Sequence, residues 1–217
     1  MALGEDLPYS DLTVVCSGKS FKIHKIKLYE YSDWFKTALA SRFQVRSIAI
    51  LIVHGSCINE GTAATITLEE DDPKLFEAML KHCYRQSYED IRAVEDDATS
   101  TTSWGPPCID TFDGKLFCLA DKYQCRPLAL EIAAYFERMF TTTSLTSSEV
   151  FVFLDIVYDL PSGSLITVLQ DMFRRILVPK LPTYLKAADF QKLYQRHLLL
   201  ASDCLDMIRQ HYPPKAR

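Results

Sequence analysis

The segment at residues 10–39 reads SDLTVVCSGKSFKIHKIKLYEYSDWFKTAL, and it decides the fold of this chain. Its first half contains two runs rich in β-branched and aromatic residues, at residues 11–16 and 20–23. The residues between them, 17–19, are Ser-Gly-Lys and have the composition of a hairpin turn. We therefore expect two short antiparallel strands here.

The second half of this segment changes from strand spacing to helix spacing. Ile26, Leu28 and Tyr29 predict a short helix, and Ser32 or Asp33 can cap a second helix. The strand hairpin is therefore expected to lead directly into a pair of helices.

The next part of the chain contains one more strand, one more helix and a loop. The residues TITL at 65–68 predict the strand, and Asp72 followed by Pro73 is typical of a helix start. Residues 87–111 are acidic, then rich in Ser and Thr, then Gly-Pro-Pro, without a sustained period. We expect a mobile loop there.

The remainder of the chain has only helical patterns. Apolar residues at helical spacing predict helices over residues 113–123, 127–139, 149–159, 165–176 and 189–210. Strands followed by helices indicate an α+β domain with an all-helical C-terminal extension.

The composition is that of a globular protein and excludes some functions. The chain has 217 residues, of which 48% are hydrophobic and 24% charged, with a net charge of −4. Because phosphate binding needs a basic field, we expect no direct nucleic-acid binding. No apolar run is long enough to span a bilayer, so we expect no membrane association.

The cysteines indicate a reducing compartment. The chain has seven cysteines without a C-x-x-C pair, and MALGEDLPYS at residues 1–10 is not a secretory signal. We interpret the cysteines as reduced, mostly buried thiols and expect a cytoplasmic or nuclear location.

Several short motifs occur in an order that carries a family resemblance. They are Ser10-Asp11, Phe21-x-x-His24-Lys25, Asp72-Pro73-x-x-Phe76, Tyr84 and Ala120-Asp121-Lys122-Tyr123. Together they resemble a BTB/POZ domain of the short fungal type, over about residues 9–140. The resemblance implies a BTB/POZ fold, a small sheet with flanking helices, and leaves residues 141–217 as the helical extension.

The resemblance also implies a function. Such domains are non-enzymatic interaction modules, often self-associating, and many are adaptors that bring a substrate protein to a cullin-type ubiquitin ligase. The expected partners are therefore a cullin-type scaffold protein and an unknown substrate protein, with a monomer or a weak homodimer as the oligomeric state. The alternative is a transcriptional or chromatin scaffold that acts through partner proteins.

An uncharged run, SIAILIV, lies inside an apparent insertion at residues 45–59. Removing these residues joins Phe43-Gln44 to Glu60, and the rejoined order resembles the hydrophobic-x-Glu element with which related domains engage cullin. We interpret the insertion as a retained intron or a gene-model error. The alternative is a genuine loop insertion, which a surface loop tolerates at small entropic cost.

The candidate site residues form two groups. The partner-binding candidates are Phe43, Gln44, Glu60, Tyr84, Arg85 and Tyr88, and the structural or dimer-surface candidates are Asp11, His24 and Lys25. We expect no catalytic, cofactor-binding or metal-binding residues. A base such as His24 has no Ser or Cys that can be placed beside it, and no zinc-ligand spacing is present.

Overall fold

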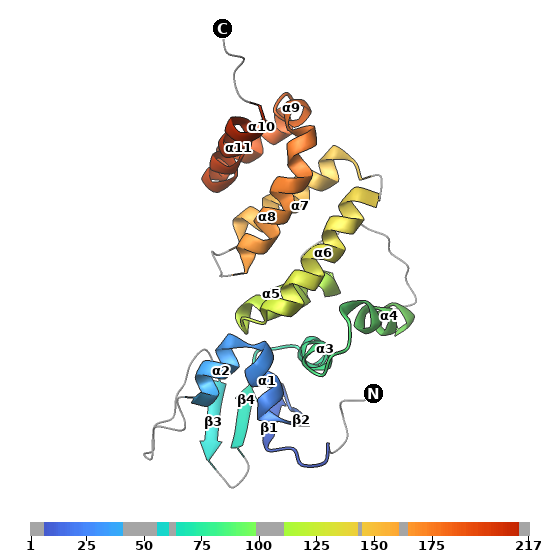
Figure 1. Ribbon diagram of the computed structural model, residues 1–217, viewed down its shortest axis with the longest axis vertical. Helices are drawn as coiled ribbons and strands as arrows, with labels where there is room; N and C mark the ends of the chain where they lie inside the picture. Colours follow the sequence, from blue (N-terminus) through green and yellow to red (C-terminus); the bar gives the residue numbers. More distant parts are fainter. Residues whose placement is uncertain are drawn as a thin grey trace. The chain divides into compact units, whose positions relative to one another are not determined.

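The computed structural model describes residues 7–40, 56–60, 64–98, 111–142, 145–160 and 165–212 (Figure 1). The chain divides into two compact units. The first consists of Met1–Ser103 with Lys115–Leu128, and the second of Trp104–Gly114 with Ala129–Arg217. Each unit is described by itself below.

The first unit contains a four-stranded sheet with the strand order β2-β1-β4-β3. Strands β1 (Leu12–Cys16) and β2 (Lys19–Ile23) are antiparallel, as the sequence predicts. Strand β4 (Ala64–Leu68) runs parallel to β1, and β3 (Ser56–Glu60) pairs antiparallel with β4. The expected strand at residues 65–68 is therefore confirmed.

The hairpin turn has the backbone that its sequence favours. Ser17 and Gly18 have φ values of 42° and 85°, so both central residues are left-handed. A two-residue loop of this kind matches the twist of the flanking strands. The Ser17 hydroxyl also donates to the Asp71 carbonyl oxygen at 2.8 Å, which ties the turn to the segment after β4.

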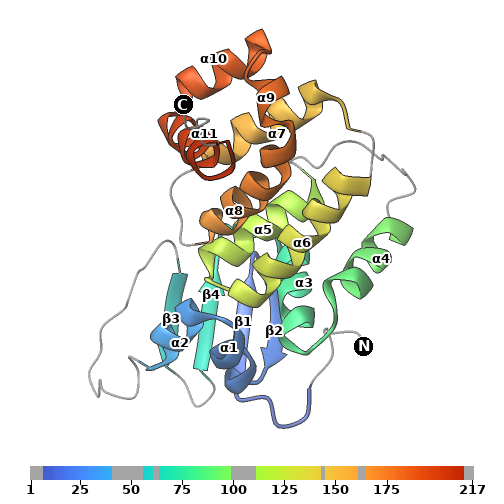
Figure 2. The same ribbon diagram turned by 45° about the horizontal axis from the view of Figure 1, so that its top comes forward.

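Three helices pack against the sheet, and side-chain caps mark the starts of two of them. They are α1 (Lys25–Tyr31), α2 (Asp33–Ala40) and α3 (Pro73–Cys83), and the views show α1 and α2 lying against the sheet (Figures 1 and 2). The Ser32 hydroxyl accepts from the Phe35 N–H at 3.1 Å, and the Asp72 carboxylate accepts from the Lys74 N–H at 2.7 Å. The predicted caps are thus confirmed.

The core between the sheet and the helices is aromatic. Phe35 stacks on Tyr123 with ring centroids 5.1 Å apart, and Phe76 meets both rings edge-on or tilted. Tyr123 directly follows α5 (Phe112–Lys122), so α5 closes this core. All three side chains are at most 1% exposed.

Part of the expected mobile loop at residues 87–111 is a helix, α4 (Tyr88–Ala98). The Ser87 hydroxyl accepts from the Asp90 N–H at 3.2 Å and donates to the Asp90 carboxylate at 2.6 Å. Tyr88 and Ile91 lie on one face of this helix and are each 2% exposed. The cap and the two buried side chains outweigh the acidic composition that indicated a loop; residues 99–110 lie outside the described part.

The larger segment of the second unit, Ala129–Arg217, is helical and begins within α6 (Arg126–Thr142). It continues with α7 (Ser147–Asp159), α8 (Ile166–Leu177), η1 (Val178–Lys180), α9 (Leu181–Tyr184), α10 (Ala188–Arg196) and α11 (Leu198–His211). Phe140, Phe153 and Phe173 form its core, with each pair of ring centroids 5.2 Å apart. The helices expected over residues 113–176 are confirmed.

The single helix expected over residues 189–210 is wrong, because the structure has two helices, α10 and α11, with a break at His197. His197 has an extended backbone, with φ −108° and ψ 99°, and it ends α10 and precedes α11. Its Nε2 atom lies 2.7 Å from the Asp155 carboxylate on α7, and Arg196 bonds the same carboxylate. These contacts with α7 hold the break, and no local sequence signal announces them.

Two expectations concern features the described residues cover only in part. Residues 45–55 of the apparent insertion lie outside the described part, while residues 56–59 belong to β3. The origin of the insertion stays a hypothesis.

Among the helices that the structure describes, none combines the length and the apolar character needed to cross a bilayer.

Candidate interaction surface

Four of the predicted residues meet at one junction, which we call the clasp: Asp11, His24, Lys25 and Tyr84. Asp11 precedes β1, and His24 lies between β2 and α1. Lys25 is the first residue of α1, and Tyr84 caps the C-terminal end of α3. The Lys25 N–H donates to the Asp11 carboxylate at 2.7 Å, so Asp11 satisfies one of the free amides at the start of α1. The structural role expected for Asp11, His24 and Lys25 fits this geometry.

His24 contributes three hydrogen bonds to the clasp. Its backbone N–H donates to the Tyr84 hydroxyl at 3.0 Å, its Nδ1 lies 2.8 Å from that hydroxyl, and its Nε2 lies 3.1 Å from the Pro8 carbonyl oxygen. Because a carbonyl only accepts, Nε2 donates its hydrogen to Pro8, while Nδ1 and the Tyr84 hydroxyl share the other hydrogen bond. The ring is thus held at both of its nitrogen atoms.

The Tyr84 hydroxyl is held in its neutral form. Burial raises the pKa of Tyr84, the nearby Cys83 and Asp11 raise it further, and the hydrogen bond from the His24 backbone acts in the opposite direction. The Lys27 ammonium lies 5.9 Å from the centre of the Tyr84 ring. Tyr84 therefore acts mainly inside the domain, between α3 and α1.

Large apolar side chains are exposed close to the clasp, and we call them the α1 surface: Tyr9, Ile26 and Tyr29. They are 96%, 64% and 42% exposed. Tyr9 follows Pro8, which bonds His24, and the Lys36 ammonium lies 5.5 Å from the centre of the Tyr29 ring. Exposed aromatic and aliphatic side chains near one another are typical of a protein contact surface.

The spacing within α1 contains the signal for this surface, although the sequence analysis did not use it. At 100° per residue, Ile26 and Leu28 point in nearly opposite directions, while Ile26 and Tyr29 are about 60° apart. A single helix face cannot bury all three. The structure buries Leu28 completely and leaves the other two in solvent.

The other partner-binding candidates have different outcomes. Phe43 and Gln44 lie outside the described residues, and Glu60 ends β3 with its backbone paired to Ala64. Arg85 is exposed, with a left-handed backbone of φ 68°, at the end of α3. Tyr88, the first residue of α4, is buried and only 2% exposed. It therefore does not face a partner, contrary to its assignment.

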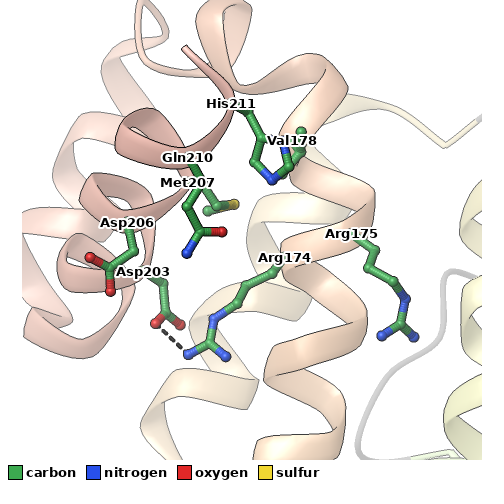
Figure 3. Close-up of a pocket in the computed structure, with 8 residues that line it drawn as sticks. All are labelled: Arg174, Arg175, Val178, Asp203, Asp206, Met207, Gln210 and His211. Atoms are coloured by element: carbon green, nitrogen blue, oxygen red, sulfur yellow. Dashed lines mark hydrogen bonds and ion pairs between the residues drawn. The ribbon is translucent and has the colours of Figure 1, made fainter. Parts of the chain in front are cut away.

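The second unit contains a pocket of about 610 Å³ between α8 and α11 (Figure 3). It is lined by Arg174, Arg175, Val178, Asp203, Asp206, Met207, Gln210 and His211. Asp203, which is 7% exposed, accepts from Arg174 at 2.5 Å and from the Tyr158 hydroxyl at 2.5 Å. The hydrogen bond that Arg174 donates to Asp203 raises the pKa of Arg174, so the guanidinium keeps its charge.

Asp203 on α11 thus connects Arg174 on α8 with Tyr158 on α7. Arg175 is likewise paired with Glu137 at 2.7 Å. Within the described ranges, no three His, Cys, Asp or Glu side chains are grouped in a way that could hold a metal ion. The chemistry visible in both units is that of a folded scaffold with exposed contact surfaces.

The small sheet is flanked by helices, and apolar side chains beside it are exposed where another protein can cover them. Residues 3–100 match the family model of the BTB/POZ domain. The chain therefore carries a BTB/POZ domain, which is a protein-protein interaction module, as the motifs predict. The match ends at residue 100, so the domain boundary at residue 140 stays a prediction. A search of curated proteins finds no match to this chain.

Proposed function

We propose that this protein is an adaptor that brings a substrate protein to a cullin-type ubiquitin ligase. An adaptor needs two separate contact surfaces, one for each partner. The observation that carries the proposal is that the BTB/POZ domain and a second compact unit each expose large apolar side chains. The adaptor acts in the cytoplasm or the nucleus and performs no chemistry of its own.

The second unit supplies the surface for the substrate. On α11, Leu198 is 81% exposed, Leu199 56% and Leu205 55%. Leu198 and Leu205 are seven residues apart, so they lie on the same side of the helix. We assign this side of α11 to the substrate protein, and the BTB/POZ domain to cullin.

The α1 surface supports weak self-association of the same domain. Ile26 and Tyr29 present apolar area in solvent, and a second copy that covers it would remove that area from water. Homodimerisation through this surface is compatible with an adaptor, because it leaves α11 of each copy available.

The test is an affinity pull-down from cell lysate with cullin as the readout. The full chain is compared with a version that lacks residues 45–59, after circular dichroism has shown both to be folded. Capture of cullin by both versions supports the adaptor and shows that residues 45–59 do not block the contact. Capture by the shortened version alone supports the adaptor and the artefact hypothesis together.

Two other outcomes go against the proposal. If both folded versions fail to capture cullin, the ligase-adaptor function is wrong. If they capture chromatin factors and no cullin, the chromatin scaffold is the better assignment. A Leu198→Asp, Leu205→Asp double variant separates the two surfaces, because it should lose the substrate and retain cullin. A Gln195→Asp variant, at an exposed position of α10 outside this side of α11, serves as the control for added charge.

A further inference from the structure

Helix α11 carries two apolar stripes, whereas an ordinary amphipathic helix carries one. The first stripe is Leu200, Cys204 and Met207, which are at most 4% exposed and belong to the core of the second unit. The second stripe, which we call the α11 seam, consists of Leu198, Ala201, Leu205 and Ile208. Because the first stripe already anchors the helix, the fold itself does not require the second.

The α11 seam has the spacing of a coiled coil. Its residues are separated by three, four and three positions, which is the a and d pattern of a heptad repeat. At about 100° per residue, they lie within an arc of about 80°, and the centre of this arc is about 110° away from that of the buried stripe. The seam extends along the helix for about 15 Å. Its geometry therefore matches one face of a second helix laid alongside α11.

The side chains of the seam are accessible to another protein. Leu198 and Leu205 are more than half exposed, and Ala201 and Ile208 are half-buried. Leu199, also more than half exposed, adds apolar surface at the start of the helix. Three of the ten large apolar side chains that are exposed in the described part of the chain thus belong to this one helix. Such a concentration is typical of a contact surface.

A cation borders the seam on its solvent side. On the helix, Ser202 and Arg209 lie directly beside Leu198 and Leu205, and both are exposed. The Arg209 guanidinium lies 3.7 Å from the Asp206 carboxylate, which is longer than a hydrogen bond. This ion pair is also open to solvent, so it contributes little to stability. Arg209 is therefore available to a carboxylate on the molecule that covers the seam.

The buried side of α11 holds the helix in place before any partner arrives. The Asp203 carboxylate accepts hydrogen bonds from Arg174 on α8 and from Tyr158 on α7, each at 2.5 Å. A partner would therefore meet a helix that is already formed, and little conformational entropy would be lost on this side of the contact. The free energy gained by removing Leu198 and Leu205 from water would then contribute to binding.

We propose that the α11 seam binds an amphipathic helix of the substrate protein. This inference rests on the proposed adaptor function and specifies what the adaptor recognises. The substrate helix has Leu or Ile at heptad spacing, which pack against Leu198 and Leu205. A Glu beside this stripe pairs with Arg209.

A second copy of this chain fits the seam less well. The residues that border its own seam are Ser202 and Arg209, and in an antiparallel pair Ser202 of one copy would meet Arg209 of the other. Neither residue supplies the carboxylate that Arg209 lacks. Three turns of one helix also bury less than the roughly 800 Å² per partner that a stable dimer needs, whereas transient contacts are smaller. The charge at the border therefore favours an acidic partner helix.

The test is fluorescence anisotropy with the full chain and three labelled peptides of about three heptads each. The first peptide has Leu at the a and d positions and Glu beside them, the second has the same composition in scrambled order, and the third has Lys in place of each Glu. Each is used below the concentration at which it self-associates. We expect the first peptide to bind at least about tenfold more tightly than the scrambled one.

Variants of the chain locate the contact, after circular dichroism has shown them to be folded. Leu205→Asp should weaken binding of the first peptide at least about tenfold, because it places a charge inside an apolar contact. Leu130→Asp, at an exposed position of α6, is the matched control and should have no effect. Arg209→Glu should weaken binding of the Glu peptide and strengthen binding of the Lys peptide, each by about two- to fivefold.

The outcomes separate this inference from the adaptor function. Equal binding of the first and the scrambled peptide, or binding of neither, overturns the inference. An Arg209→Glu variant that changes the affinity for neither charged peptide overturns the acidic partner. The cullin pull-down tests the adaptor independently: capture of cullin without peptide binding retains the adaptor and removes the helix site, and peptide binding without capture of cullin does the reverse.

Discussion

Replacing Tyr123 by Phe tests the buried polar network that fixes α5 to the sheet. Asp71 is 8% exposed, and its carboxylate accepts from the Tyr123 hydroxyl at 2.5 Å and from the Lys122 ammonium at 2.8 Å. The Asp71 carbonyl oxygen accepts from Cys16 and Ser17 at the end of β1. A single residue thus connects the strand hairpin to α5.

The magnitude follows from what the variant leaves behind. Phe retains the ring that stacks on Phe35, so the aromatic core loses little packing. It removes one donor from a buried carboxylate, and hydrogen bonds to charged groups contribute about 1.5–3 kcal/mol. The Lys122 ammonium remains, which places the expected destabilisation of the first unit in that range. With a slope of about 1–3 kcal/mol per molar urea, the midpoint should fall by roughly 1 M.

The assay is urea unfolding followed by the fluorescence of Trp34, whose ring centroid lies 5.1 Å from that of Tyr123. The background is Trp104→Phe, so that Trp34 is the single tryptophan. The matched control is Tyr158→Phe, which removes the equivalent bond to Asp203 in the second unit. If Tyr123→Phe lowers the free energy of unfolding by less than about 0.5 kcal/mol, which is the range of an ordinary surface substitution, the role of this hydrogen bond is refuted.

Three further predictions follow from named contacts. Burial raises the pKa of Tyr123 and of Tyr158, so these tyrosines ionise at a lower pH in the unfolded chain than in the folded one. Their contribution to the free energy of unfolding is full below pH ~10 and falls above it by about 1.4 kcal/mol per pH unit for each tyrosine. Urea unfolding between about pH 9 and 11.5 measures this, and Tyr123→Phe should make the loss of stability reported by Trp34 fluorescence smaller. The hydrogen bond from His197, followed by that from Arg196, lowers the pKa of Asp155. The contribution of Asp155 to stability is therefore present above pH ~4 and is lost as the pH falls through its pKa in the folded state. Asp155→Asn should make the helical circular dichroism signal less dependent on acid pH, and an unchanged profile contradicts this. Ile26→Asp should shift sedimentation toward the monomer, while Val94→Asp, at an exposed position of α4, should have no effect.

Local signals explain why the first unit could largely be predicted. The hairpin turn, the Ser32 cap and the Asp72-Pro73 helix start each depend on residues within a few positions of one another. The break at His197 could not be predicted, because a carboxylate on α7 holds it. Helix α4 lies between these cases, since its Ser87 cap was readable but the acidic and Ser/Thr-rich composition outweighed it.

The candidate site was predicted only in part, for a similar reason. Motif residues from distant positions, such as His24 and Tyr84, do meet, but their polar atoms are used within the domain. The hydrogen bond from the Tyr123 hydroxyl to Asp71 likewise joins residues that are 52 positions apart, and only the fold brings them together.

The distribution of charge indicates where recognition takes place. The buried carboxylates Asp71 and Asp203 each bind a cation and a tyrosine hydroxyl, so their charges stabilise the two units and are already matched. By contrast, Ile26 and Leu198 are more than 60% exposed and gain free energy only when another surface covers them. A protein built in this way discriminates among partners through the shape of its apolar surfaces.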